Sequence, residues 1–542
     1  MRAKFQDSDL VRELTLPLIL ISVYASLGGA SFGLDFNSWS GQIGMAQFKK
    51  DLGVFDEGTE SYIVPSTWLS IGSGTPQAGL AMGCLVAGFV GRAIGRVRCF
   101  YLAASIGIVG ILVQAATIHS YWQFMVGRVI NSVSMGIICN VVPAYQSECA
   151  PAKIRGTLIN TYQFWLLVGA VMAATCNWGT QYWTTHWAWR LVVVIQFLIP
   201  ILMLVGGTVL PESPRWLVGK GRNEQALKVL RILRRGAPDD VIQQEWRLLI
   251  AAEEEQAEHH SATTWLDCFR GSNLRRTAIA TGVQCLQNAQ GNSFIATYSI
   301  VFLQAIGVTD TYKVLILLYF TNMVASGFAF YFADKIGRRP LLFGAACVMA
   351  ICMFTVAGVT GYDNNPQSIK GALACLFIWQ FVQAVGWSSC VWIVTAETPT
   401  LQLREKTITI STFAGFIVGV LVTYINPYMQ DAGFGNLQGK VGFVYGSFSV
   451  VAAVWVVFML PELKGRALEE LDEMFEKNVS VFQFSTFQTE GWGAQIARAE
   501  QVAAAKGHAM ATSIIDGVEP DTDIEVGIAN EKGEARTKIA EV

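Results

Sequence analysis

Long apolar segments are the feature of this sequence that most limits what it can fold into. Runs such as 98–118, 188–210 and 438–460 approach or exceed the ~20 residues that a helix needs to cross about 30 Å of hydrocarbon. Because lipid offers no hydrogen-bond partners, the backbone of such a run must be satisfied within a helix or a closed barrel. Barrel strands alternate polar and apolar residues, and these runs do not. The segments are therefore predicted to be transmembrane helices.

Twelve such spans are predicted, and charged residues make up only 15% of the chain, against roughly 25% in ordinary globular proteins. The first span follows Arg2, Lys4 and Arg12 without a small-residue cleavage site, so we expect it to be retained. The spans lie near 16–38, 64–90, 98–118, 121–144, 158–179, 188–210, 276–304, 313–333, 339–361, 369–394, 406–427 and 438–460.

Positive charge is concentrated in the loops that follow spans two, four, eight and ten. The intervening loops are short and poor in Lys and Arg, apart from Lys49 and Lys50. By the positive-inside rule, both termini are predicted to be cytoplasmic. The basic residues concerned are Arg92, Arg96, Arg98, Lys153, Arg155, Lys335, Arg338, Arg339, Arg404 and Lys406.

A polar stretch divides the spans into two sets of six. Residues 211–275 carry three consecutive glutamates and a helical pattern from Asn223 to Arg235, which is typical of a cytoplasmic linker with short helices. The tail is poor in large aliphatic residues from about residue 480, which predicts that it is largely disordered there. The predicted order is a cytoplasmic N-terminus (1–15), a six-helix bundle (16–210), the linker (211–275), a second six-helix bundle (276–460) and a cytoplasmic tail (461–542).

Short motifs recur in matched order after corresponding spans of the two halves, which is typical of a transporter built from repeats. The chain is thus predicted to be an all-α polytopic membrane protein with two pseudo-symmetric six-helix bundles. The matched motifs are Gly95-Arg96 and Gly337-Arg338, Glu148-x6-Arg155 and Glu397-x6-Arg404, and Pro211-Glu212 and Pro461-Glu462.

These motifs resemble those of the sugar porter family of the major facilitator superfamily, over roughly residues 15–475, with a general likeness to fungal hexose transporters. The most specific strings are Pro211-Glu212-Ser213-Pro214-Arg215-Trp216-Leu217, Asp334 to Arg339, and Pro461-Glu462 with Lys464-Gly465-Arg466. The resemblance implies a multi-pass carrier in the plasma membrane that moves a monosaccharide, a hexose or pentose, by alternating access. It also implies a monomer in the bilayer without cofactor or nucleic acid.

Acidic and basic residues at the cytoplasmic helix ends are expected to pair, to hold the two bundles together on one side and to act as a gate. A single exposed pair contributes about 0–1 kcal/mol, so only a network could bias the rocking equilibrium. The alternative is that the arginines only set topology. Where the family has an acidic residue after span two, this chain has Arg92. The N-terminal copy of the repeated motif therefore lacks its carboxylate. The expected gate consists of Arg96, Glu148, Arg155, Glu212, Arg215, Asp334, Arg338, Arg339, Glu397, Arg404 and Glu462.

Asp35 and Arg128 place charge inside predicted spans, where it costs at least about 2.5–3.5 kcal/mol and indicates function by default. Proton-coupled members of the family carry Asp and Arg at these matching positions. The resemblance therefore implies that Asp35 alternates between a protonated and an Arg128-paired form, which couples uptake to protons. The alternative is structural, with Asp35 capping a broken helix and Arg128 forming a plain structural pair.

A sugar site needs amides and hydroxyls together with an aromatic face. Asn288 and Ser293 stand where the family has Gln and Asn, which leaves the substrate open, and Gln383 could add a polar contact. For each amide, the alternative role is a bridge between helices. Span ten lacks the prolines that normally precede its tryptophan, so a kink is expected to be missing. The site that the resemblance implies is Gln163, Gln287, Asn288, Ser293, Asn322 and Trp392, with Tyr298 as an outer gate.

Three other functions compete with monosaccharide transport. An enzyme would need clustered His, Asp or Cys, yet the five histidines lie in polar segments or at loop edges without metal-ligand or nucleophile spacing, so none is predicted. A non-transporting sensor is expected to lose the coupling and gating residues, which remain here. A carrier of a polyol, quinate-like compound, disaccharide or secondary metabolite stays open.

Overall fold

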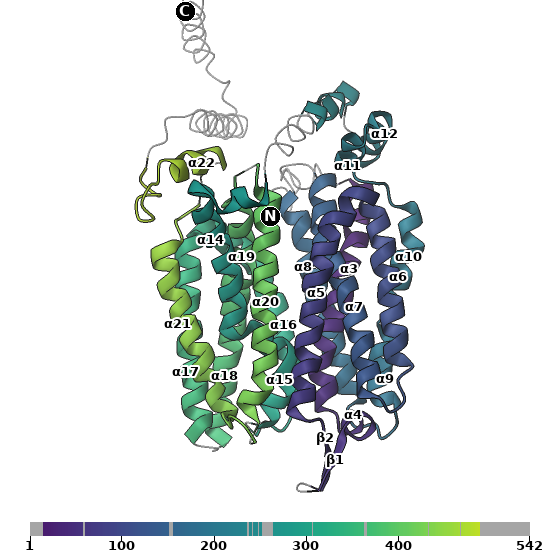
Figure 1. Ribbon diagram of the computed structural model, residues 1–542, viewed down its shortest axis with the longest axis vertical. Helices are drawn as coiled ribbons and strands as arrows, with labels where there is room; N and C mark the ends of the chain where they lie inside the picture. Colours follow the sequence, from purple (N-terminus) through teal and green to yellow (C-terminus); the bar gives the residue numbers. More distant parts are fainter. Residues whose placement is uncertain are drawn as a thin grey trace, which may run out of the picture. The chain divides into compact units, whose positions relative to one another are not determined.

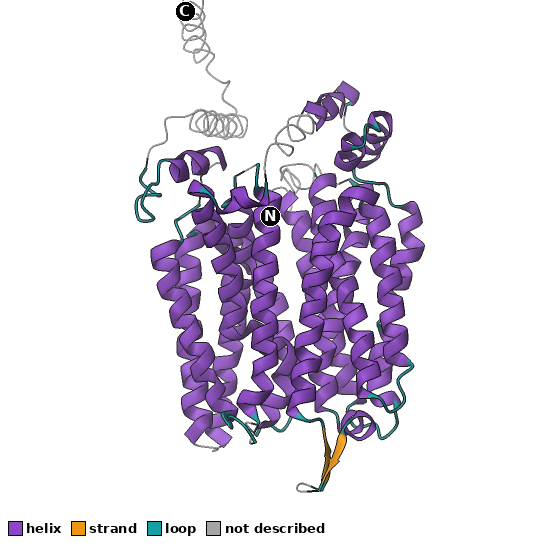
Figure 2. Cartoon of the chain, viewed as in Figure 1, coloured by secondary structure: helices purple, strands orange, loops and turns teal. Residues whose placement is uncertain are grey.

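The computed structural model describes residues 15–57, 60–150, 155–235, 238–240, 242–247, 249–251, 264–305, 307–362, 366–400, 402–431, 433–464, 466 and 468–487. Contacts divide the chain into two compact units, Met1–Lys464 and Gly465–Val542. Helices account for nearly all of the described structure (Figure 2). Of the predicted N-terminal segment, only Thr15 lies within the described residues.

The first bundle is built from six helical runs of the first unit, which Figure 1 colours from purple to blue-teal. A short helix, α4 (Ala46–Leu52), and a hairpin of β1 (Val54–Asp56) and β2 (Ser61–Ile63) connect its first two runs, with Val54 paired to Ile63. The runs are α3 (Leu16–Gly44), α5 (Ser66–Ile94), α6 (Arg96–Ala115), α7 (Tyr121–Cys149), α8 (Arg155–Thr180), and α9 (Trp187–Ile195) with α10 (Leu198–Gly206) and η2 (Gly207–Val209).

The second bundle repeats this plan, but two of its runs are interrupted by π-helical turns. The runs are α14 (Gly271–Gln287), η4 (Asn288–Asn292) and α15 (Ser293–Ala305); α16 (Thr311–Ile336); α17 (Arg338–Tyr362); α18 (Pro366–Gln383), η5 (Ala384–Ser388) and α19 (Ser389–Glu397); α20 (Arg404–Gln430); and η6 (Gln438–Lys440) with α21 (Val441–Met459).

Nine helical runs in the described part of the chain are long and apolar enough to cross a membrane by length and composition. Together with α5, α8 and the α14–α15 run, they correspond to the twelve predicted spans. The first run continues to Gly44 rather than ending at 38, and the seventh begins at Gly271 rather than at 276. Thr15 explains where α3 begins, because its hydroxyl accepts the N–H of Leu18 at 3.4 Å and Pro17 occupies the first turn.

The linker contains the short helices α11 (Pro214–Gly219), α12 (Asn223–Leu233) and η3 (Trp265–Phe269). Short helices were predicted for this stretch. Its glutamates, at 253–255, lie outside the described residues. Arg231 in α12 donates to Asp239, which lies beyond the end of this helix, at 2.9 Å. This bond and one from Gln243 hold the pKa of Asp239 below its usual value.

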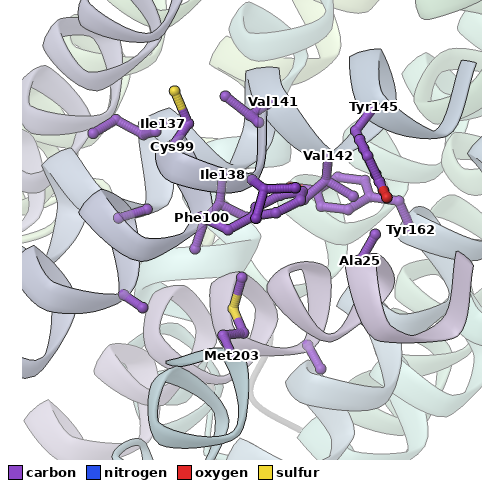
Figure 3. Packing of buried hydrophobic residues seen from close by; sticks show 14 of the residues in the cluster. Ala25, Cys99, Phe100, Ile137, Ile138, Val141, Val142, Tyr145, Tyr162 and Met203 are labelled. Atoms are coloured by element: carbon purple, nitrogen blue, oxygen red, sulfur yellow. The ribbon is translucent and has the colours of Figure 1, made fainter. Parts of the chain in front are cut away.

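The core of the first bundle is a cluster in which α3, α6, α7 and α10 meet (Figure 3). Phe100, Ile138, Val142 and Met203 are almost fully buried there. Close approach depends on small residues, as expected for helices packed in lipid. A Cβ added at Gly33 would lie 1.8 Å from the carbonyl oxygen of Leu166 in α8, so only glycine fits.

The two bundles touch through α3 with α15, α5 with α20, and α8 with α16. The following three hydrogen bonds cross between them among the residues that the structure describes. Ser40 accepts the N–H of Ile300 at 3.2 Å, Tyr312 donates to the carbonyl of Gly41 at 2.8 Å, and Ser66 donates to Asp431. All three lie where α3 ends and α5 begins, so the bundles are fastened at that end of the helices.

The second unit contains α22 (Leu468–Glu476) and a turn-rich segment to residue 487. Arg466 donates to the carbonyls of Phe484 and Phe487, and the rings of Phe475 and Phe484 lie 5.1 Å apart. Defined contacts therefore continue a few residues past 480, where disorder was predicted to begin. Residues 488–542 lie outside the described part of the chain.

Candidate functional site

The first cluster of predicted gate residues lies at the start of α6. Gly95 has a φ of +101°, and a Cβ there would lie 2.4 Å from Glu212, so glycine is required by both conformation and space. Glu212 accepts the backbone N–H of Arg96 at 2.8 Å, while the Arg96 side chain forms two bonds with Glu148, at 2.8 and 3.2 Å. The carboxylate of Glu212 thus caps the positive end of α6.

The second bundle carries the same arrangement at the start of α17. Gly337 has a φ of +106° and a Cβ there would lie 2.7 Å from Glu462. Glu462 accepts the N–H groups of Arg338 at 3.0 Å and Arg339 at 3.1 Å, and Arg338 pairs with Glu397 at 3.1 Å. The internal repeat predicted from the sequence is therefore reproduced down to individual hydrogen bonds.

Both described ion pairs of these clusters join helix ends within one bundle. These two pairs, Arg96 with Glu148 and Arg338 with Glu397, do not cross between the bundles, and the role of the four residues as a gate that holds the bundles together stays a prediction. Arg215 and Arg404 also make contacts. The side chains of Arg92, Arg155 and Asp334 lie outside the described residues.

Asp35 and Arg128 are both buried between helices of the first bundle, with 4% and 3% of their surfaces exposed. They are in electrostatic contact, and Asp35 also faces the amide of Asn131. Arg128 donates to the carbonyl of Gly72 at 3.1 Å and stacks on the ring of Trp39, 4.1 Å from its centroid. Within the described residues, no salt bridge joins Asp35 to Arg128, so the cation is held by a carbonyl and an aromatic face instead.

The interruption between α14 and α15 brings three predicted site residues together. Gly291 adopts a φ of +99° within η4, which breaks the helix at this point. Ser293 donates to the side-chain oxygen of Asn288 at 2.8 Å, and Gln287 donates to the carbonyl of Trp387 at 3.1 Å. The shortened residues Asn288 and Ser293 thus satisfy one another. π-turns of this kind often occur at functional sites.

Span ten is also interrupted, although its prolines are missing. The π-helical turn η5 interrupts the regular helix here. Gln383, next to this turn, donates to the side-chain oxygen of Asn292 at 3.1 Å. Gln383 thus makes a polar contact within the protein, while a contact of Gln383 with solute stays a prediction. Trp387 is fully buried and donates to the carbonyl of Leu342, whereas the predicted aromatic residue Trp392 is 42% exposed.

Gln77 in α5 was not identified from the sequence, yet it reaches this region from the first bundle. A Cβ added at Gly419 in α20 would lie 2.8 Å from Gln77 Nε2, 3.4 Å from Asn288 Oδ1 and 3.5 Å from Ser293 Oγ. Gln77 therefore lies next to two predicted site residues. The sequence signal was an amide inside an apolar span, but several spans contain one.

Buried amide atoms without a partner among the described residues also occur here. They include the side-chain oxygens of Gln77, Gln290 and Gln383. Buried polar atoms are normally hydrogen-bonded, so such a group is well suited to bind the hydroxyls of a solute.

Gln163 and Asn322 lie on α8 and α16, which pack against one another across the two bundles. Both side chains are half-buried. Their convergence with Gln287 on one cavity remains a prediction. Tyr298 is 4% exposed in α15, close to the end where the bundles are fastened.

Comparisons with known proteins agree with this architecture. The family model described as "Sugar (and other) transporter" matches residues 21–475. A high-affinity fructose transporter, ght6, of Schizosaccharomyces pombe is 28% identical over 487 residues, which cover 87% of this chain and 89% of the relative. A major facilitator-type transporter, ecdD, of Aspergillus rugulosus is 30% identical over 501 residues, covering 90% and 92%.

A solved structure with the same fold is the inward-open xylose transporter XylE from E. coli. It has a TM-score of 0.70 at 23% identity and covers 84% of this chain and 99% of XylE. Another structure of XylE, with the same TM-score, is described as a proton:xylose symporter.

Proposed function

Since the chain belongs to the sugar (and other) transporter family, we propose that it carries a neutral monosaccharide, a hexose or pentose, by alternating access and proton-coupled uptake. The family makes it a multi-pass sugar transporter of the major facilitator fold and not an enzyme. The proposed location is the plasma membrane, with both termini and the two glycine–arginine clusters on the cytoplasmic side.

The observation that carries the proposal is the group of amides on and beside the two interrupted helices, with Gln77 of α5 nearby. Gln287, Asn288 and Ser293 lie on η4 and its flanks, Gln383 joins the two breaks, and Gln77 approaches from the other bundle. Such a site can donate and accept hydrogen bonds without carrying charge, which suits a neutral polyhydroxyl solute. Gln163, Asn322 and Trp392 are proposed to complete it.

Alternating access is supported by the position of the contacts between the bundles. The bonds that Ser40 and Gly41 accept and that Ser66 donates hold the bundles together at the end that we place outside, while both described gate pairs lie within single bundles at the other end. Because the outer end is held by bonds between the bundles and the two described gate pairs each stay within one bundle, we assign this arrangement to an inward-facing state. Reversal requires these outer bonds to break.

Proton coupling is proposed from the surroundings of Arg128. The Gly72 carbonyl and the Trp39 ring hold this cation independently of the charge on Asp35. Asp35 can therefore gain a proton without leaving Arg128 unsupported, and it can lose the proton beside a cation that is already in place. The fructose and xylose transporters named above are similar proteins, and this likeness supports a sugar as the cargo.

The test is initial-rate uptake of radiolabelled solutes in cells stripped of their own hexose carriers. The panel contains hexoses, pentoses, a disaccharide and polyols, each with and without a protonophore. Uptake of a hexose or pentose that falls when the proton gradient is collapsed is expected. If only polyols were taken up, the proposed monosaccharide cargo would be wrong. If a sugar bound to the protein but was not taken up, the protein would be a sensor rather than a carrier.

A further inference from the structure

A pocket of about 400 Å³ lies beside the first glycine–arginine cluster, and none of the residues proposed to bind solute lines it. It is formed where α6 begins, where η2 ends and where α11 and α12 of the linker pack. Val97 and Leu217 are buried in its lining, which makes part of its wall apolar. The pocket contains part of the Pro211–Leu217 motif that solute binding does not explain.

Cations surround this pocket. Arg98 and Arg222 line it, and both are exposed. Lys220 Nζ lies 5.9 Å and the Arg222 guanidinium 6.0 Å from the ring of Trp216, which also lines the pocket. Three positive side chains are thus gathered around one cavity, and a basic pocket of this kind favours an anion.

Glu212 is the only carboxylate among the lining residues, and its charge is already compensated. It accepts backbone N–H groups at the start of α6, from Arg96 at 2.8 Å and Val97 at 3.3 Å, and that of Ser213 at 3.0 Å. A carboxylate in this position neutralises the helix end rather than the cations of the pocket. The positive charge of Arg98 and Arg222 therefore stays available to a ligand.

The position of the pocket distinguishes a lipid from a soluble anion. Two membrane-spanning runs end beside it, at Arg96 and Val209, so it lies at the depth of the lipid headgroups. Val205 and Val209 on the same run are 68% and 86% exposed, which offers an apolar surface for acyl chains. Tyr101 in the lining is of the amphipathic aromatic type that is enriched at this depth.

We propose that this pocket binds the headgroup of an anionic phospholipid, with its phosphate diester between Arg98 and Arg222 and its acyl chains over Val205 and Val209. Basic pockets at the ends of transmembrane helices suit such headgroups. A bound lipid would anchor the linker helices to the bilayer surface beside the Arg96 cluster. The proposal holds for any transported solute, so it stands or falls separately from the proposed function.

The test measures binding of dioctanoyl phosphatidylserine to the purified full-length protein in neutral detergent. The double variant Arg98→Gln/Arg222→Gln is expected to raise the dissociation constant about thirtyfold, or about fivefold for each guanidinium removed. The matched control is Lys228→Gln/Arg235→Gln, which removes the same charge from exposed positions of α12 and the turn after it that do not line the pocket. The control is expected to bind as the unaltered protein does.

Two further ligands separate the sources of the phosphate. Dioctanoyl phosphatidylcholine and inorganic phosphate are each expected to bind much more weakly than the anionic lipid. Equal affinity for inorganic phosphate would overturn the lipid assignment, as would unchanged lipid affinity in the double variant. Arg98→Lys/Arg222→Lys keeps the charge and is expected to restore most of the affinity, which separates loss of the site from loss of the fold.

Discussion

Arg128 is supported by more than the carboxylate that the sequence suggested for it. Its bond to the Gly72 carbonyl and its position over the Trp39 ring are present although no salt bridge to Asp35 forms within the described residues. A buried cation that depended on one carboxylate would be destabilised each time that carboxylate took up a proton. The observed arrangement therefore permits Asp35 to change its charge while Arg128 stays in place.

Asp35→Asn is expected to abolish accumulation of solute against its gradient while exchange of solute across the membrane continues. The amide keeps the size of the carboxyl but cannot exchange a proton with the solution. Accumulation ratio and counterflow are measured in parallel. Asp310→Asn is the matched control, because Asp310 is exposed and its ion pair, among the described residues, is with Lys313 three residues away. Accumulation by Asp35→Asn that equals the unaltered level would refute the coupling role.

Gly419 tests whether Gln77 and its neighbours bind solute. The atom that an alanine Cβ would meet first, Gln77 Nε2 at 2.8 Å, is the end of a flexible side chain and can move aside at little cost in stability. Gly419→Ala should therefore displace the amide and raise KM about two- to tenfold, the equivalent of one hydrogen bond of about 0.5–1.5 kcal/mol.

Gly344→Ala is the control for Gly419→Ala, since a Cβ at Gly344 meets nothing within 4 Å. The two variants are compared by KM and by thermal unfolding in detergent. A KM that stays constant while the protein unfolds earlier would mean that Gly419 serves packing alone.

At the scale of single elements, the helices were predictable and their interruptions were not. Long apolar runs located the spans because, in lipid, a run that lacks the alternation of a barrel strand can satisfy its backbone only as a helix. Near Gln383 the local pattern offers Gly386 and two serines, which helices often accommodate, and the missing prolines indicated a continuous helix. The break in span ten instead coincides with a tertiary bond, from Gln383 to Asn292 on another helix. A contact between two helices that are far apart in the chain cannot be predicted from the periodicity of either helix.

Gly291 is the residue on which the break in span seven depends. At a φ of +99° any side chain is strained, by about 1–3 kcal/mol, and a Cβ would also lie 3.1 Å from the ring of Tyr445. Gly291→Ala is expected to lower the thermal unfolding temperature and to reduce transport, because a regular helix would turn Asn288 and Ser293 away from each other. Gly358→Ala, which meets nothing within 4 Å, is expected to change neither. Normal transport by Gly291→Ala would show that the break is dispensable.

At the scale of the whole transporter unit, the repeat in the sequence predicted the symmetry correctly, while the gating role of its charged residues stays a prediction. Gly95 and Gly337, with Glu212 and Glu462, form matching caps in the two bundles. The repeat could not reveal which partners each arginine takes, since pairing within a bundle and pairing between bundles need the same residue types. Which end of the helices is fastened depends on contacts between α3 and α15 that are far apart in the chain.

Tyr312 provides the test of that fastening. Its hydroxyl donates across the bundles to Gly41 at 2.8 Å, so Tyr312→Phe removes a bond that exists only while this end is closed. Losing about 0.5–1.5 kcal/mol should raise the outward-facing fraction and lower the KM for external solute about two- to tenfold. Initial-rate uptake measures this change.

Tyr319→Phe makes the same chemical change at a buried hydroxyl that has no partner among the described residues. Because no bond between the bundles is lost there, the KM for external solute should stay constant. A carrier in which both substitutions lowered KM equally would be responding to altered packing of α16. If neither did, the bond from Tyr312 would contribute nothing to the equilibrium between inward- and outward-facing states, and closure of this end would have to rest on the helix contacts of α5 with α20.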